Sequence, residues 1–185
     1  MPRMSATLEA LTARLDWIRA APADGGRLEL IVRRPAVDAR ELLDEGLLDT
    51  RAGLHGDRWG AGRGAADGAG GADNQVTIMN ARATAVVAAS EERGRWALAG
   101  DQLYVDLDIG ETNLPAGTRL SVGGAVLEVT ALPHTGCGKF SRRFGVDAAK
   151  FVNSAEGRAL RLRGLNARVV QGGAIATGDA VHKLP

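Results

Sequence analysis

Apolar and polar residues alternate along several short segments, the pattern of β-strands with one buried face. The clearest case is 103–109, where the apolar residues fall at every second position. Further strands are predicted at 27–35, 75–79, 118–122, 125–130 and 166–170, with shorter strand segments through Val181. Pro35 cannot donate to a strand ladder, so the first strand should end there. Gly123 and Gly124 accept the positive φ angles of a tight hairpin turn between 118–122 and 125–130.

Helical periodicity is confined to a few segments. In 5–20 the apolar residues Leu8, Leu11, Leu15 and Ile18 share one face, which predicts an amphipathic N-terminal helix. Asp38 and Glu41 have the spacing of a capping box, which predicts a short helix that continues to about Gly46. Two more short helices are expected at 147–152 and 156–162, with Asp147 as a cap of the first.

These elements predict a mainly β fold with short helices. At least six short strands and few long helices favour a closed or nearly closed β-barrel. We expect an N-terminal helical extension over 1–24 and a barrel domain over 25–185. The segment 60–74 is almost entirely small residues and predicts a mobile surface loop, a linker or a lid. It lacks the Gly-Lys-Ser/Thr of a phosphate-binding loop.

Composition narrows the function classes. The chain has 185 residues, enough for one sizeable core, and 23 basic against 22 acidic residues give a net charge of +1. Nothing in that charge predicts nucleic-acid binding. A single cysteine excludes an internal disulfide, and we find neither a signal-peptide pattern nor an apolar run long enough to span a membrane. We therefore expect a cytoplasmic protein.

The one cysteine, Cys137, lies in the segment with the most reactive chemistry. It is flanked by Gly136 and Gly138, and His134, Lys139, Arg142 and Arg143 are within six residues. A lone cysteine is more often buried and inert, but nearby cations and an open backbone favour a reactive thiolate. The functional interpretation is therefore the stronger one. A zinc site is not predicted, because the three histidines at 55, 134 and 182 fit no zinc spacing.

The neighbouring polar residues leave several roles open. His134 is either a general base or anion donor, or a loop histidine held by a backbone contact. Lys139, Arg142 and Arg143 are either a solvated face or a phosphate clamp. Arg33-Arg34 and Arg161 with Arg163 leave the same choice open, whereas the His55-Gly56-Asp57-Arg58 segment either lines a pocket or forms a polar turn. Asn113 is either a ligand-binding amide or a turn residue before Pro115. The sequence thus suggests an anionic ligand without specifying it.

Five segments carry a resemblance to a known family: 95–103, 108–120 around Asn113-Leu114-Pro115-Ala116-Gly117, Pro133-His134-Thr135-Gly136-Cys137, 162–167 and, more weakly, 53–59. The resemblance is to the MOSC domain family, named after the C-terminal domain of molybdenum cofactor sulfurases. It implies a β-barrel and a cysteine, here Cys137, that either ligates molybdenum or carries sulfur as a persulfide. By motif position it also implies a cavity lined by His134, Thr135, Asn113, Arg163 and Asn166, with Arg34 and Arg58 as candidate contacts to the phosphate of the molybdopterin.

Three functions follow as expectations. In the first, the chain binds the molybdenum cofactor through Cys137 and reduces small N-hydroxylated or N-oxygenated substrates, with Lys139 and Arg142 adding positive charge. In the second it is a sulfur carrier that uses a Cys137 persulfide. In the third it is a non-enzymatic binding module. The sequence contains no second redox centre, so a separate electron donor or a separate cysteine desulfurase is expected as partner. The pyridoxal phosphate of larger, fused family members is not assigned to this chain.

Overall fold

Seven strands close into a β-barrel in the computed structural model, which describes residues 5–59 and 71–185. The order around the barrel is β1 (Gly26–Arg33), β11 (Ala180–Lys183), β7 (Arg119–Val122), β8 (Ala125–Val129), β9 (Leu165–Gln171), β5 (Val76–Asn80) and β6 (Leu103–Asp106). The ring closes where Gly26 of β1 lies opposite Val181 of β11. The predicted mainly β barrel is confirmed.

Two smaller strand groups extend the barrel. β2 (Glu41–Leu43) pairs with β1, and a separate sheet has the order β10 (Gly173–Ala176), β3 (Glu45–Asp49) and β4 (Gly53–Leu54). The hairpin of β7 and β8 turns at Gly123-Gly124 as predicted, and Gly123 has a φ of +53°. The strands predicted at 75–79, 103–109 and 166–170 are present as β5, β6 and β9, with β6 ending three residues early.

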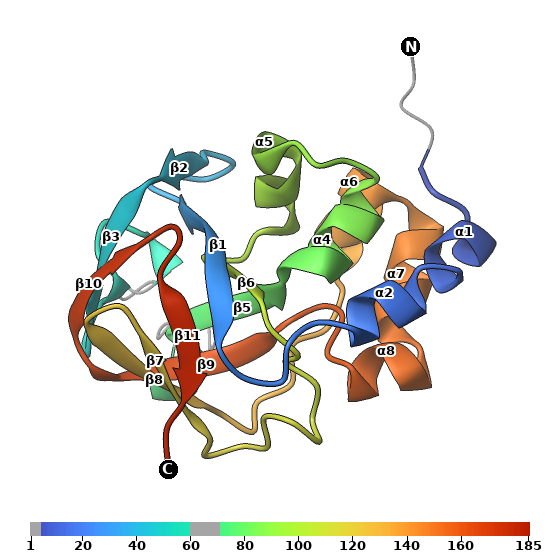
Figure 1. Cartoon of the computed structure of the whole chain (residues 1–185). Helices are drawn as coiled ribbons and strands as arrows, with labels where there is room; N and C mark the ends of the chain where they lie inside the picture. The colour runs from blue at the N-terminus through green and yellow to red at the C-terminus, as the bar shows by residue number, and fades with distance from the viewer. Residues whose placement is uncertain (1–4, 60–70) are drawn as a thin grey trace.

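Most helices lie on one side of the barrel (Figure 1). They are α1 (Leu8–Thr12), α2 (Leu15–Arg19), α4 (Ala81–Ala88), α6 (Gly138–Phe144), α7 (Val146–Asn153) and α8 (Ala155–Ala159), while α5 (Arg93–Trp96) and the 3-10 turn η3 (Ala97–Ala99) lead back to β6. β5 and β6 run parallel, and a parallel pair needs a long crossover, which α4, α5 and η3 provide. Asn80 at the end of β5 caps α4, because its Oδ1 accepts a hydrogen bond from Ala83 N at 2.9 Å.

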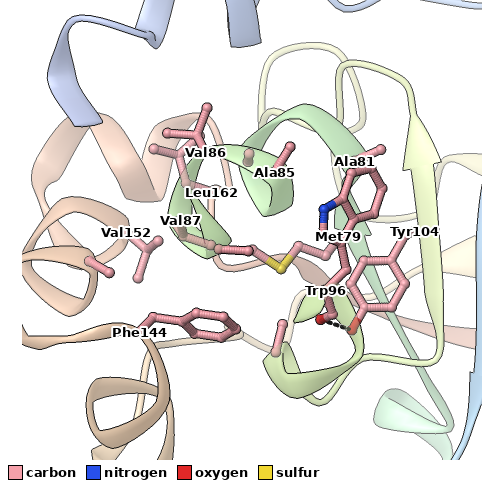
Figure 2. Close-up of a cluster of buried hydrophobic side chains, with 14 of the residues drawn as sticks. Met79, Ala81, Ala85, Val86, Val87, Trp96, Tyr104, Phe144, Val152 and Leu162 are labelled. Carbon is pink, nitrogen blue, oxygen red and sulfur yellow. Dashed lines mark hydrogen bonds between the residues drawn. The ribbon is translucent and has the colours of Figure 1, made fainter. Parts of the chain in front are cut away.

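Two hydrophobic clusters form the core. One fills the barrel and includes Leu28, Ile78 and Leu103. The other lies between the barrel wall and the helices and includes Met79 and Tyr104 (Figure 2). Adjacent residues of β5 therefore face different clusters, and the whole strand is buried. This packing fixes the position of α6 and of the segment that precedes it.

The prediction of a helix from Asp38 to Gly46 is wrong. Asp38 has a φ of +58°, outside the helical region, and the segment instead forms β2 and the start of β3. Glu41 does not cap a helix but accepts a hydrogen bond from Arg33 Nε at 2.6 Å on the neighbouring strand, where the two residues lie opposite each other. Pairing with β1 therefore overrides the local capping signal.

The predicted N-terminal helix is present as two short ones. Leu11, Leu15 and Ile18 are buried as their spacing indicated, whereas Leu8 is 40% exposed. The helix breaks at Arg14, which has φ −97° and ψ 0° and stacks over the Trp17 ring at 4.6 Å. These helices contribute to the same cluster as α4, α6 and α7. The division of the chain at residue 24 stays a prediction.

Other expectations have mixed outcomes. The helices predicted at 147–152 and 156–162 correspond to α7 and α8, but Asp147 does not cap α7: its Oδ2 accepts a hydrogen bond from Leu8 N at 3.1 Å. Residues 60–70 of the predicted glycine-rich loop lie outside the described residues, and Ala72–Asn74 forms a 3-10 turn, η2. No helix within 5–59 and 71–185 is both long and apolar enough to cross a membrane.

Candidate functional site

A cavity of about 410 Å³ lies between the segment that follows β1, the end of η3, and α6. Its volume is within the range of small-molecule sites. Eight of the candidate site residues from the sequence line it: Arg34, Arg58, His134, Thr135, Cys137, Lys139, Arg143 and Arg163. Segments more than 100 residues apart in the chain thus meet around Cys137.

Cys137 is exposed and stands immediately before the first turn of α6, in the N-cap position. Burial raises the pKa of its thiol, but the nearby backbone N–H groups of Phe140 and Lys139 and the charge of Arg163 lower it by more. The net result is a thiol pKa below its usual value, which increases the thiolate fraction at neutral pH.

This shift predicts that Cys137 reacts with iodoacetamide faster at neutral pH than an ordinary thiol. The reason is that the thiolate is the nucleophile, and a lowered pKa moves the pH midpoint of the reaction downward. The rate can be followed by intact mass over a pH series, with glutathione as reference, because the chain has only one cysteine. A midpoint at or above that of glutathione would contradict the prediction.

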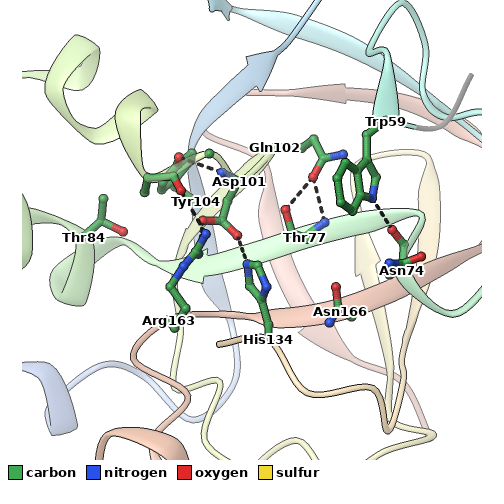
Figure 3. A network of polar contacts seen from close by, with 12 residues as sticks. Trp59, Asn74, Thr77, Thr84, Asp101, Gln102, Tyr104, His134, Arg163 and Asn166 are labelled. Carbon is green, nitrogen blue, oxygen red and sulfur yellow. Dashed lines mark hydrogen bonds and ion pairs between the residues drawn. The ribbon is translucent and has the colours of Figure 1, made fainter. Parts of the chain in front are cut away.

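A buried carboxylate, that of Asp101, holds two side chains of the cavity wall, His134 and Arg163 (Figure 3). Asp101 is completely buried and binds Arg163 Nη1 at 2.6 Å through one oxygen and His134 Nε2 at 2.9 Å through the other. Desolvation raises the pKa of Asp101, but the charge of Arg163 and the contacts with His134 outweigh it, and the pKa falls to about 2. His134 is therefore held by a side chain, not by the backbone contact considered from the sequence.

Arg163 is oriented from several sides. Its Nη2 donates to Ala99 O at 2.9 Å, and its guanidinium lies over the Phe140 ring at 5.0 Å. Its side chain is only 7% exposed, and Nε is buried with no hydrogen-bond partner among the described residues. A buried N–H of a cation without a partner is costly, so Nε is a candidate donor to a bound group.

A second buried ion pair supports another part of the cavity wall. Asp57 is buried and accepts hydrogen bonds from the backbone N, Nε and Nη2 of Arg34 and from the backbone N of Trp59. Arg34 Nη1 donates to Gly100 O at 2.7 Å, and its guanidinium lies over the Trp59 ring at 5.3 Å. Arg34 is thus fixed at the edge of the cavity by its planar fork.

The cavity wall is strongly cationic. Besides Arg34 and Arg163, which have buried carboxylate partners, Arg143 lies 3.5 Å from the exposed Asp38. Within the described ranges, Arg40, Arg58 and Lys139 form no ion pair, although all three line the cavity. Burial, and then the charges of Arg143 and Arg34, lower the pKa of Arg40. The uncompensated charge favours an anionic ligand.

Three predicted site residues lie outside the cavity lining. Asn113 does not line it: its Nδ2 donates to Ala23 O and Asp108 O, so it stabilises a turn, the alternative left open from the sequence. Asn166 is buried, and its Nδ2 donates to Leu132 O and Pro133 O, so it supports the backbone that leads to His134. Arg142 is exposed on α6.

Sequence reasoning assigned no role to several residues that the fold brings to the site. Asp101 lies within the segment 95–103 that carried the family resemblance, and only this resemblance drew attention to it. Arg40 was hidden in the wrongly predicted helix, and Thr77 lies within an ordinary strand pattern. Arg40 and Thr77 line the cavity, and Asp101 binds the lining residues His134 and Arg163.

Solved structures and a family comparison place the chain among known proteins. YUAD from Bacillus subtilis superposes with a TM-score of 0.61 at 21% identity, over 86% of this chain and 97% of that one. YiiM from Escherichia coli superposes with a TM-score of 0.55 at 17% identity, over 86% and 70%. YiiM from Geobacillus stearothermophilus superposes with a TM-score of 0.58 at 14% identity, over 86% and 75%. These likenesses show the fold alone.

No curated protein sequence matches the chain. The MOSC domain, which is associated with binding of the molybdenum cofactor, matches residues 65–182. The matched range contains Cys137, His134, Asp101 and Arg163, and it covers more than half of the sequence. The chain therefore belongs to the MOSC domain family.

Proposed function

We propose that this protein binds the molybdenum cofactor with Cys137 as a molybdenum ligand and reduces small N-hydroxylated or N-oxygenated substrates. The observation that carries the proposal is an exposed thiol of lowered pKa on the wall of a cavity with uncompensated positive charge. A thiolate is a soft ligand suited to such a metal, and arginines suit the phosphate of the pterin.

The donor set fits this group. In the described part of the chain, no three His, Cys, Asp or Glu side chains cluster to hold an ion. A metal at Cys137 would therefore take its other ligands from a cofactor. Arg40, Arg58 and Lys139 would bind the phosphate, and the partnerless Nε of Arg163 offers a further donor. When bound, the cofactor would supply a redox-active metal for cleavage of an N–O bond.

The protein's own residues orient and enclose the ligand. Asp57 and Asp101 fix Arg34 and Arg163, so these cations need no reorganisation when an anion binds. The Trp59 and Phe140 side chains supply apolar walls that exclude water. Reduction of a hydroxylamine, RNHOH, to RNH₂ and water consumes two electrons and two protons, and the electrons would come from a separate donor protein.

Metal content and activity test the proposal together. Protein purified from a host that makes the cofactor should contain close to one molybdenum per chain and should reduce an N-hydroxylated amine with a chemical electron donor. Protein from a host unable to make the cofactor should do neither. Absence of molybdenum from the first preparation would refute the proposal.

The exposure and lowered thiol pKa of Cys137 also favour a second function, that of a sulfur carrier. Incubation with a cysteine desulfurase and cysteine, followed by intact mass measurement, separates the two. A carrier gains one sulfur atom at Cys137 and contains no molybdenum. If neither molybdenum nor sulfur is bound, the third function, a non-enzymatic binding module, gains support.

A further inference from the structure

Two adjacent residues, Asp101 and Gln102, hold two different side chains of the cavity wall. Both are completely buried. Asp101 binds His134, and Gln102 Oε1 accepts hydrogen bonds from the backbone N and the hydroxyl of Thr77, at 2.9 and 2.6 Å (Figure 3). His134 and Thr77 both line the cavity, whereas their two partners lie behind them. Asp101 and Gln102 therefore determine whether His134 and Thr77 present hydrogen-bond donors or acceptors to the cavity.

The contact with Gln102 fixes the direction of the Thr77 hydroxyl. The backbone N of Thr77 is only a donor, so the amide atom that faces it must be the oxygen. The Thr77 hydroxyl lies 2.6 Å from the same oxygen and must therefore donate its single hydrogen to it. This leaves Thr77 Oγ1 with lone pairs only, an acceptor for any group in the cavity.

The contact with Asp101 fixes which ring nitrogen of His134 carries the hydrogen. The Asp101 carboxylate is ionised and can only accept, so His134 Nε2 carries a hydrogen. The negative charge of Asp101 is already balanced by Arg163 at 2.6 Å. The Cδ2 edge of the His134 ring packs against Gly164, which places Nδ1 on the opposite edge, where it has no hydrogen-bond partner among the described residues. In the neutral ring, Nδ1 is then an acceptor.

These two acceptors lie in a polar wall made mostly of hydrogen-bond donors, where the exposed Asp38 carboxylate and the Thr135 hydroxyl can also accept. The arginines and Lys139 around the cavity can only donate hydrogen bonds. We infer that Asp101 and Gln102 are positioning residues that make His134 Nδ1 and Thr77 Oγ1 the acceptors for N–H or O–H groups of the ligand. This inference rests on the proposed function for the identity of the ligand: the donor groups belong either to the pterin of the cofactor or to an N-hydroxylated substrate.

The tautomer of His134 tests the inference without any ligand. Long-range ¹H–¹⁵N correlation spectra of the full chain, with His134→Gln for assignment, report which ring nitrogen carries the hydrogen; only three histidines are present. In the neutral His134 ring we expect the hydrogen on Nε2 alone, and loss of that preference in Asp101→Asn. A neutral ring with its hydrogen on Nδ1 in the wild-type protein would overturn the inference, whether or not the protein binds molybdenum.

Thr77 variants identify which ligand donates. Thr77→Val keeps the shape of the side chain but removes the acceptor, and Thr77→Ser keeps the hydroxyl as the matched control. If the pterin donates, molybdenum retention during dialysis weakens roughly tenfold in Thr77→Val only. If the substrate donates, molybdenum content is unchanged and the KM for the hydroxylamine rises roughly tenfold in Thr77→Val only. Equal behaviour of the two variants in both measurements would overturn the assignment of Thr77.

Discussion

Replacement of Cys137 with serine should abolish molybdenum binding and reduce N-hydroxylamine reduction by at least roughly 100-fold, since loss of residues that merely support a metal ligand already costs about 10- to 100-fold. A serine hydroxyl is not ionised at neutral pH and is a hard ligand, so it cannot replace the thiolate. The fold should be unaffected, because Cys137 is exposed and serine is a favourable residue at the N-cap of α6.

The loss of molybdenum and activity can be measured separately from any change in stability. Elemental analysis and the reduction assay measure the loss, while thermal unfolding should show stability unchanged or raised by up to about 1 kcal/mol. Ser141→Ala, one turn further along α6 and outside the cavity lining, is the matched control and should retain molybdenum. Retention of molybdenum in Cys137→Ser would show that the thiolate is not a ligand.

The barrel was predictable because its strands carry local signals. The alternation over 103–109 and the Gly123-Gly124 turn both report local backbone conformation, and the structure confirms the turn and a strand over 103–106. The strands in segment 38–46 were not predictable, because local signals do not report which strands pair. Its capping signal is local, but the pairing of Glu41 with Arg33 that overrides it depends on two strands that meet only in the folded chain.

The site was predictable only where chemistry is concentrated in sequence. The segment from His134 to Lys139 places an imidazole, a thiol and an amine within six residues, and all three line the cavity. The partners that fix their state come from elsewhere: Asp101 is 33 residues from His134 and 62 from Arg163. No spacing rule links such residues, so only the family resemblance pointed to the segment that contains Asp101.

Replacement of Asp101 with alanine should lower the free energy of unfolding by about 3–5 kcal/mol at neutral pH, because it leaves Arg163 buried and without its carboxylate. Denaturant titration followed by circular dichroism measures the loss. Asp16→Ala is the matched control: its carboxylate is 98% exposed and pairs only with Arg19 among the described residues, so its removal should change stability by less than about 0.5 kcal/mol.

Low pH should reduce the difference in the free energy of unfolding between the wild-type protein and Asp101→Ala. The folded-state pKa of Asp101, about 2, is below its ordinary value of 3.8, so its ionisation stabilises the fold above pH 3.8, and this contribution disappears as the pH falls through 2. The shift corresponds to roughly 2–3 kcal/mol. Wild-type stability should therefore fall toward that of the variant between about pH 4 and pH 2, and no such fall should occur in Asp101→Ala beyond what other carboxylates cause.

A constant difference in stability between the two proteins over this range would mean that Asp101 is not held ionised by Arg163 and His134. Such a result would also remove the physical basis for the His134 tautomer.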